Sequence, residues 1–124
     1  MGLDIYFYKY RKDDEVPEEI GYFRKVNFLV GFFEGYGMDV VDQEPLVIHP
    51  EYITDLIECC RDVLDEPNLA NDLLPTYPGF FFGSYEYDDY YDSVKKVLEF
   101  CENKLMKEFK DLQEGDYITF EIWY

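Results

Sequence analysis

The two ends of the chain carry alternating patterns that most constrain its fold. Residues 2–11 read GLDIYFYKYR and residues 116–124 read DYITFEIWY. Near the N-terminus, alternation divides the side chains between two faces, one with Leu3, Ile5, Phe7 and Lys9 and the other with Asp4, Tyr6, Tyr8 and Tyr10. Such alternation among aromatic and β-branched residues is typical of a strand. We expect the two terminal strands to pair, with helices on one face of the sheet.

Three helices are expected between these strands. The first covers residue 19 to about 35, the second opens at Pro50 and is ended by Pro67, and the third runs from residue 88 or 89 to 112. The second has the clearest amphipathic pattern, with apolar residues at helical spacing from Ile53 to Leu64. Residues 46–48 predict a short strand, and residues 79–84, GFFFGS, a short strand or a loop. The sequence therefore predicts a single α+β domain over residues 1–124, with a small antiparallel sheet that includes the N- and C-terminal strands and packs against about three helices.

The charge of the chain restricts its partners. There are 28 acidic and 11 basic residues, for a formal net charge of −17. This balance argues against direct binding to nucleic acid or to an anionic membrane, since both need basic side chains. It permits binding to a basic protein. Because 48% of the residues are hydrophobic and 20% are aromatic, we expect a folded domain rather than a disordered acidic chain.

Cysteine usage suits a reducing compartment. The chain has an odd number of cysteines, namely Cys59, Cys60 and Cys101. We expect them to be reduced structural thiols. There is no apolar run of membrane-spanning length and no secretory leader pattern. We therefore expect a cytoplasmic protein with no membrane partner. The odd thiol and the aromatic surface are compatible with a homodimer but do not predict one.

A line of carboxylates follows the second predicted helix at alternating steps of four and three residues. At a rise of ~1.5 Å per residue the line is roughly 21 Å long, with neighbouring charges about 5–6 Å apart. Phosphates along one nucleic-acid strand have a comparable spacing. The line is interpreted either as a solvated helix face or as a nucleic-acid mimic that binds a basic protein. Its members are Glu51, Asp55, Glu58, Asp62 and Asp65.

Residues 85–92, YEYDDYYD, alternate aromatic and acidic side chains. Glu86, Asp88 and Asp89 are candidates for docking on an arginine-rich surface, where tyrosines stack on guanidinium groups. The alternative is a loop that leads into the third helix with some tyrosines buried. The carboxylates lack the ordered spacing of a calcium loop, so we expect no metal site.

A second candidate site is a small cluster for an anionic ligand. Arg24, Lys25 and Asn27 fall within one turn of the first predicted helix, and with Ser84 they could hold a phosphate or a carboxylate. The alternative is that the two cations pair internally with acidic side chains. His49, the single histidine, is interpreted as the residue that leads into the second helix. The chain has no recognisable catalytic motif, and we expect neither enzymatic activity nor a cofactor.

The segments MGLDIYFYK, EIGYFRKVNFLVGFF and LLPTYPGFFFGSYEYDDYY resemble a family of small acidic bacteriophage and prophage proteins that have no established activity. The resemblance covers most of the chain and implies a phage setting rather than a mechanism.

Together these features favour a non-enzymatic, phage-type anti-defence inhibitor in the host cytosol. As a nucleic-acid mimic it would bind the basic nucleic-acid-binding surface of a host nuclease or a CRISPR–Cas effector, an anti-CRISPR activity in the latter case. The alternative is a small-ligand binding protein that sequesters a phosphorylated or nucleotide signal.

Overall fold

A four-stranded antiparallel sheet forms one layer of the computed structural model, which describes residues 3–75 and 88–123. The strands have the order β2-β1-β4-β3. The elements in chain order are β1 (Asp4–Tyr10), β2 (Glu18–Arg24), α1 (Phe28–Glu34), β3 (Leu46–Ile48), α2 (Pro50–Asp65), η1 (Pro67–Leu69), α3 (Ala70–Leu73), α4 (Asp88–Phe100), η2 (Cys101–Leu105), α5 (Met106–Lys110) and β4 (Tyr117–Trp123).

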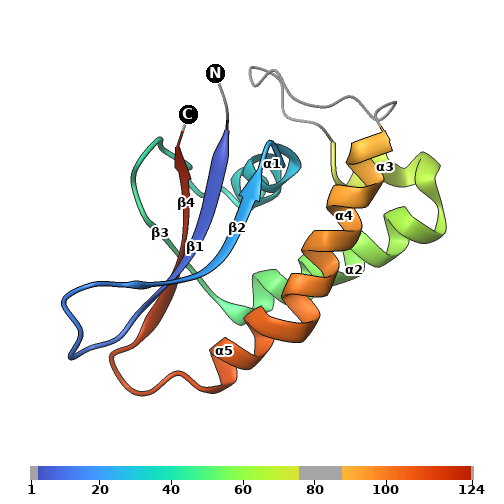
Figure 1. Ribbon diagram of the computed structural model, residues 1–124. Coiled ribbons are helices and arrows are strands. Elements are labelled where there is room, and N and C mark those ends of the chain that lie inside the picture. The colour runs from blue at the N-terminus through green and yellow to red at the C-terminus, as the bar shows by residue number, and fades with distance from the viewer. Residues whose placement is uncertain (1–2, 76–87, 124) are drawn as a thin grey trace.

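The terminal strands are central neighbours in the sheet. β1 and β4 pair along their whole length, with Phe7 opposite Phe120, and the two chain ends lie close together (Figure 1). The short strand β3 pairs with the other edge of β4. The α+β fold and the pairing of the two termini are thus confirmed.

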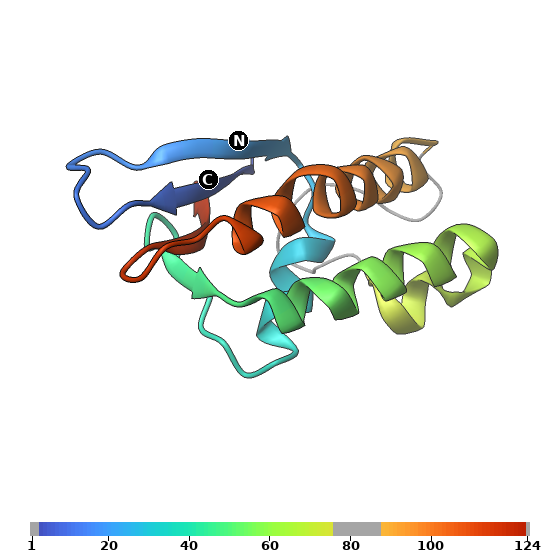
Figure 2. The same ribbon diagram turned by 90° about the horizontal axis from the view of Figure 1, so that it is seen from below.

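The helices cover one face of the sheet (Figures 1 and 2). That inner face presents buried residues of both central strands, including Ile5 and Phe7 of β1 and Phe120 of β4. The Phe120 ring lies 4.6 Å from the Phe33 ring of α1 and 5.5 Å from that of Phe7, measured between centroids. Burial of these large side chains supplies most of the driving force for packing the two layers.

The first predicted helix is wrong in its N-terminal half, where Glu18–Arg24 forms strand β2. The pairing of β2 with β1 shifts by one residue between Phe7 and Tyr8, which makes Ile20 the extra residue of a β-bulge. Both Ile20 and Phe23 therefore pack against the core although they are three residues apart. This spacing imitates the period of a helix, and the sequence pattern alone does not separate the two.

Strand β2 packs against Phe100, the last residue of α4. A Cβ atom at Gly21 would lie 2.5 Å from Cζ of Phe100, a contact that is too short for any side chain. The Phe100 ring is held between those of Phe7 and Phe23, at centroid distances of 5.1 and 5.3 Å. Glycine at position 21 lets the last turn of α4 pack onto this edge of the sheet.

The other predicted elements have the expected extents. α2 buries Ile53, Leu56, Cys60 and Val63, as its amphipathic pattern predicts. The third predicted helix is a continuous rod made of α4, the π-helical turn η2 and α5. Residues 67–73 form the short helical turns η1 and α3, whereas the GFFFGS segment lies outside the described residues.

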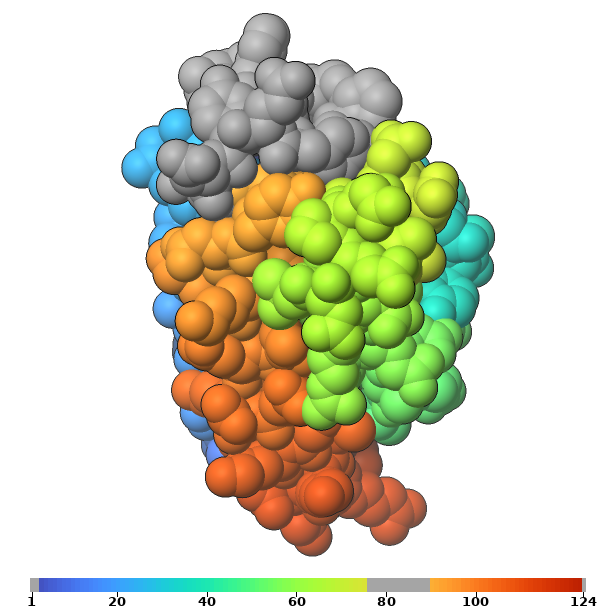
Figure 3. Space-filling model, turned by 90° about the vertical axis from the view of Figure 1, so that its right-hand side faces the viewer, coloured from blue at the N-terminus to red at the C-terminus, as the bar shows by residue number. Residues whose placement is uncertain are grey.

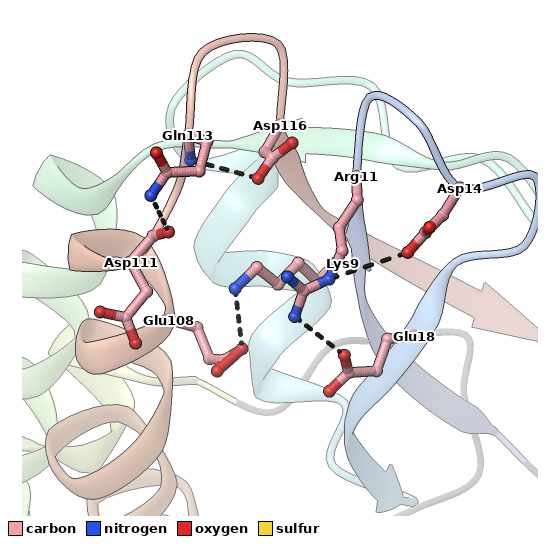
Figure 4. A network of polar contacts seen from close by, with 8 residues as sticks. All are labelled: Lys9, Arg11, Asp14, Glu18, Glu108, Asp111, Gln113 and Asp116. Carbon is pink, nitrogen blue, oxygen red and sulfur yellow. Dashed lines mark hydrogen bonds and ion pairs between the residues drawn. The ribbon is translucent and has the colours of Figure 1, made fainter.

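One buried charged side chain lies on the inner face of the sheet. The side chain of Lys9 is only 3% exposed, and its ammonium nitrogen lies 3.4 Å from a carboxylate oxygen of Glu108 on α5 (Figure 4). Nearby, Arg11 pairs with Glu18, and the Asp116 carboxylate accepts hydrogen bonds from the backbone N–H groups of Lys12 and Gln113. The bond from Lys12 to Asp116 joins the β1–β2 hairpin to the turn before β4, and the Lys9–Glu108 pair joins β1 to α5.

Candidate partner-binding surface

The predicted line of carboxylates lies along the solvent side of α2. Its residues, opposite the buried side of the helix, are all exposed. Helix α2 packs beside α4, and the surface over the two helices is broad and convex (Figure 3). We refer to Glu51, Asp55, Glu58, Asp62 and Asp65 as the acidic face.

The negative charge of the acidic face is not neutralised within the described part of the chain. Arg61, the single basic residue of α2, turns to an adjacent helical segment and pairs with Glu102 of η2. None of the ion pairs between described residues involves the acidic face. The face therefore retains its negative charge within the described part of the chain.

Two side chains beside the acidic face have raised pKa values. Burial raises the pKa of the Cys59 thiol, and the carboxylates of Asp55, Asp62 and Glu58 raise it further. The hydroxyl of Tyr36 donates a hydrogen bond to the Asp55 carboxylate, and burial together with this bond raises the pKa of Tyr36. One carboxylate of the acidic face is therefore held by Tyr36, a partner that the sequence spacing does not indicate.

The start of α2 is fixed by aromatic packing. His49 has an extended backbone and precedes Pro50, the first residue of the helix. Its ring lies 6.0 Å from the Tyr52 ring, which in turn lies 4.8 Å from the Tyr36 ring. The interpretation of His49 as the residue that leads into α2 is confirmed.

Two further predicted partner-binding residues lie at the start of α4. Asp88 and Asp89 are the first residues of this helix. Glu86 lies outside the described residues, as does Ser84 of the alternative ligand site.

The residues of that alternative site do not share a helical turn. Arg24 ends strand β2, Lys25 adopts a left-handed backbone conformation with φ of 64°, and Asn27 precedes α1. The side chains of Arg24 and Lys25 are exposed, whereas Asn27 is buried. The predicted grouping of these three residues along one helix is wrong because a strand and a turn replace its first half.

Two of the three thiols are buried, and no metal-binding group of side chains occurs within the described ranges. Cys60 and Cys101 are buried, and burial raises the pKa of both thiols. A buried thiol with a raised pKa is a poor nucleophile. In residues 3–75 and 88–123 no group of three or more metal-ligating side chains is placed to hold an ion. None of the helices in these ranges has the length and apolar character needed to cross a membrane.

No protein-family model matches the chain, and searches of curated proteins and of solved structures give no significant match.

Proposed function

We propose that this chain is a non-enzymatic binding protein whose acidic face occupies a basic nucleic-acid-binding surface on another protein. The observation that carries the proposal is the line of exposed carboxylates on α2, from which the helix's single arginine is turned away. Regularly spaced negative charges on a rigid helix present the feature that a basic channel recognises in a nucleic-acid backbone. The resemblance to phage proteins favours a host nuclease or a CRISPR–Cas effector as the target, and the host cytosol as the place of action.

The test is a pull-down from bacterial lysate with three forms of the tagged protein, at low salt and at ~0.5 M salt. The first form is unchanged. The second carries Glu58→Lys, Asp62→Lys and Asp65→Lys, and leaves Asp55 with its Tyr36 contact intact. The control carries Asp39→Lys, Glu44→Lys and Glu114→Lys, which alter exposed acids elsewhere by the same total charge.

We expect the unchanged protein and the control to retain a nucleic-acid-processing protein at low salt and to lose it at ~0.5 M, where surface charges are screened within a few ångströms. The α2 variant should retain none. Equal capture by the α2 variant would contradict the proposal, because binding would then not depend on the acidic face.

A further inference from the structure

The outer face of the sheet, opposite the helices, carries a continuous group of aromatic side chains. Alternation along β1 points Tyr6, Tyr8 and Tyr10 away from the buried inner face. Strand pairing brings residues of β2 and β4 beside them, with Tyr22 opposite Tyr6 and Tyr117 opposite Tyr10. We refer to this set as the aromatic face, which consists of Tyr6, Tyr8, Tyr10, Tyr22, Tyr117 and Trp123.

The rings of the aromatic face are ordered against one another. Tyr10 and Tyr117 are stacked with a centroid distance of 4.8 Å and an interplanar angle of 8°. The centroid of the Tyr6 ring lies 5.6 Å from that of Tyr8 and 5.1 Å from that of Tyr22. Tyr22, Tyr117 and Trp123 nevertheless remain 47%, 41% and 42% exposed. A large, ordered aromatic surface that remains in contact with water is typical of an interaction site.

Two polar side chains are buried among these rings. Glu121 pairs with Tyr6 across the strands and is only 8% exposed, and no ion pair between described residues involves it. Burial raises its pKa, although a hydrogen bond from the Trp123 side chain acts in the opposite direction. The Glu121 carboxylate in turn contributes to the raised pKa values of Tyr8 and Tyr10. The neighbouring Thr119 hydroxyl is fully buried and makes no hydrogen bond of ordinary geometry within the described residues. A buried carboxylate of this kind gains most from a cationic partner.

Charge distinguishes between possible occupants of the aromatic face. Asp4, Glu19 and Glu121 supply carboxylates there, against the single cation of Arg24. A second copy of the chain would bring these carboxylates together and would add another net charge of −17. Nucleic acid is excluded by the same repulsion. Lysine can pair with the carboxylates, but only arginine also offers a flat cation that stacks on a tyrosine or tryptophan ring.

We propose that the aromatic face docks an arginine-bearing segment of a partner protein, with guanidinium groups stacked on its rings and paired with its carboxylates. This surface lies on the side of the sheet away from α2, so the inference goes beyond the proposed function of the acidic face. It needs no contribution from the α2 carboxylates and can be tested separately.

The test uses a short oligo-arginine peptide and an oligo-lysine peptide of equal length, titrated against the full-length protein. Trp123 is the only tryptophan of the chain and belongs to the aromatic face, so its fluorescence reports binding at this surface. We expect the arginine peptide to change the emission of Trp123 and to saturate at a concentration at least about threefold lower than the lysine peptide. Equal affinity for the two peptides would overturn the inference, because binding would then follow charge alone.

Two variants test whether the exposed tyrosines cause the protein to prefer the arginine peptide. Tyr22→Ser with Tyr117→Ser removes two exposed rings. This variant should bind the arginine peptide no more tightly than the lysine peptide. The control, Asp39→Asn with Glu44→Gln at exposed loop positions, removes the charge of two acids outside both faces and should keep the ratio of the two affinities. The inference would be overturned if the control no longer bound the arginine peptide more tightly than the lysine peptide. It would also be overturned if the tyrosine variant still did so. A stable dimer of the unchanged protein that shields Trp123, measured by sedimentation and by quenching with a neutral quencher, would overturn it as well.

Discussion

Glu121 carries a carboxyl group that burial among aromatic rings makes harder to ionise. Its pKa lies above the ordinary value of 4.5, so the folded state binds this proton more tightly than the unfolded state does. The stability that this group contributes is therefore fully present below pH 4.5 and is lost as the pH rises through the raised pKa. At neutral pH the ionised carboxylate lowers the free energy of unfolding. This is consistent with a role of Glu121 in binding a partner rather than in stabilising the fold.

We expect Glu121→Gln to raise the free energy of unfolding at pH 7, because the amide has no charge to desolvate. The gain should shrink toward zero at pH 3, where the carboxyl group of the unchanged protein is protonated as well. Denaturant unfolding at the two pH values measures the difference. Glu114→Gln, at an exposed position, is the control. A lower stability of the Glu121 variant at pH 7 would contradict the raised pKa.

Lys9 presents the opposite situation, a buried cation whose partner is present. We expect Glu108→Gln to lower the free energy of unfolding by about 3 kcal/mol, because it leaves the Lys9 ammonium group unpaired in an apolar layer. Glu108 is partly exposed, which places the effect near the lower end of the usual range. Adding Lys9→Met should recover most of the loss, as measured by chemical denaturation. An additive further loss in the double variant would show that the pair does not act as a unit.

Among the elements, α2 combines a well-packed buried side with a solvent side that is poorly suited to helix stability. Asp62 and Asp65 lie in its last turn, where the negative end of the helix dipole disfavours carboxylates, and no basic residue offsets them. The repeated carboxylates at steps of four residues repel one another as well. The acidic face is therefore maintained at a cost in folding free energy.

Replacing these two residues should separate stability from binding. We expect Asp62→Asn with Asp65→Asn to stabilise the protein by a few tenths of a kcal/mol per site, as measured by thermal unfolding. The same variant should bind its basic partner more weakly. Asp39→Asn with Glu44→Gln is the matched control at exposed loop positions and should leave binding unchanged. A variant that is both less stable and equally able to bind would argue that the carboxylates are structural.

At the level of helices and strands, sequence patterns predict some elements and miss others. β1, β4, α2 and the α4–η2–α5 rod follow from periodicities that one element satisfies by itself. β2 was not predicted because the bulge at Ile20 gives a strand the apolar spacing of a helix. The contacts Tyr36–Asp55 and Arg61–Glu102 join elements distant in sequence, and spacing along the chain carries no signal for them. The line of carboxylates was predicted in full, because a single helix presents it.

At the scale of the whole molecule, a net charge of −17 opposes a compact state. We expect the melting temperature to rise between 20 mM and 0.5 M sodium chloride, since added salt screens the repulsion between carboxylates. Differential scanning calorimetry at the two salt concentrations measures the change. The triple α2 lysine variant should show a smaller rise, because its net charge is less negative. A melting temperature that falls with salt would indicate that attractive ion pairs dominate the surface.

The central claim is that the acidic face competes with nucleic acid for a basic surface. The most direct measurement is displacement of labelled nucleic acid from the protein captured in the pull-down, followed by fluorescence anisotropy. We predict that the unchanged chain and the control with altered Asp39, Glu44 and Glu114 displace the label completely, whereas the variant altered at Glu58, Asp62 and Asp65 does not. Displacement by all three forms alike, or a complex that holds protein and nucleic acid together, would contradict the account.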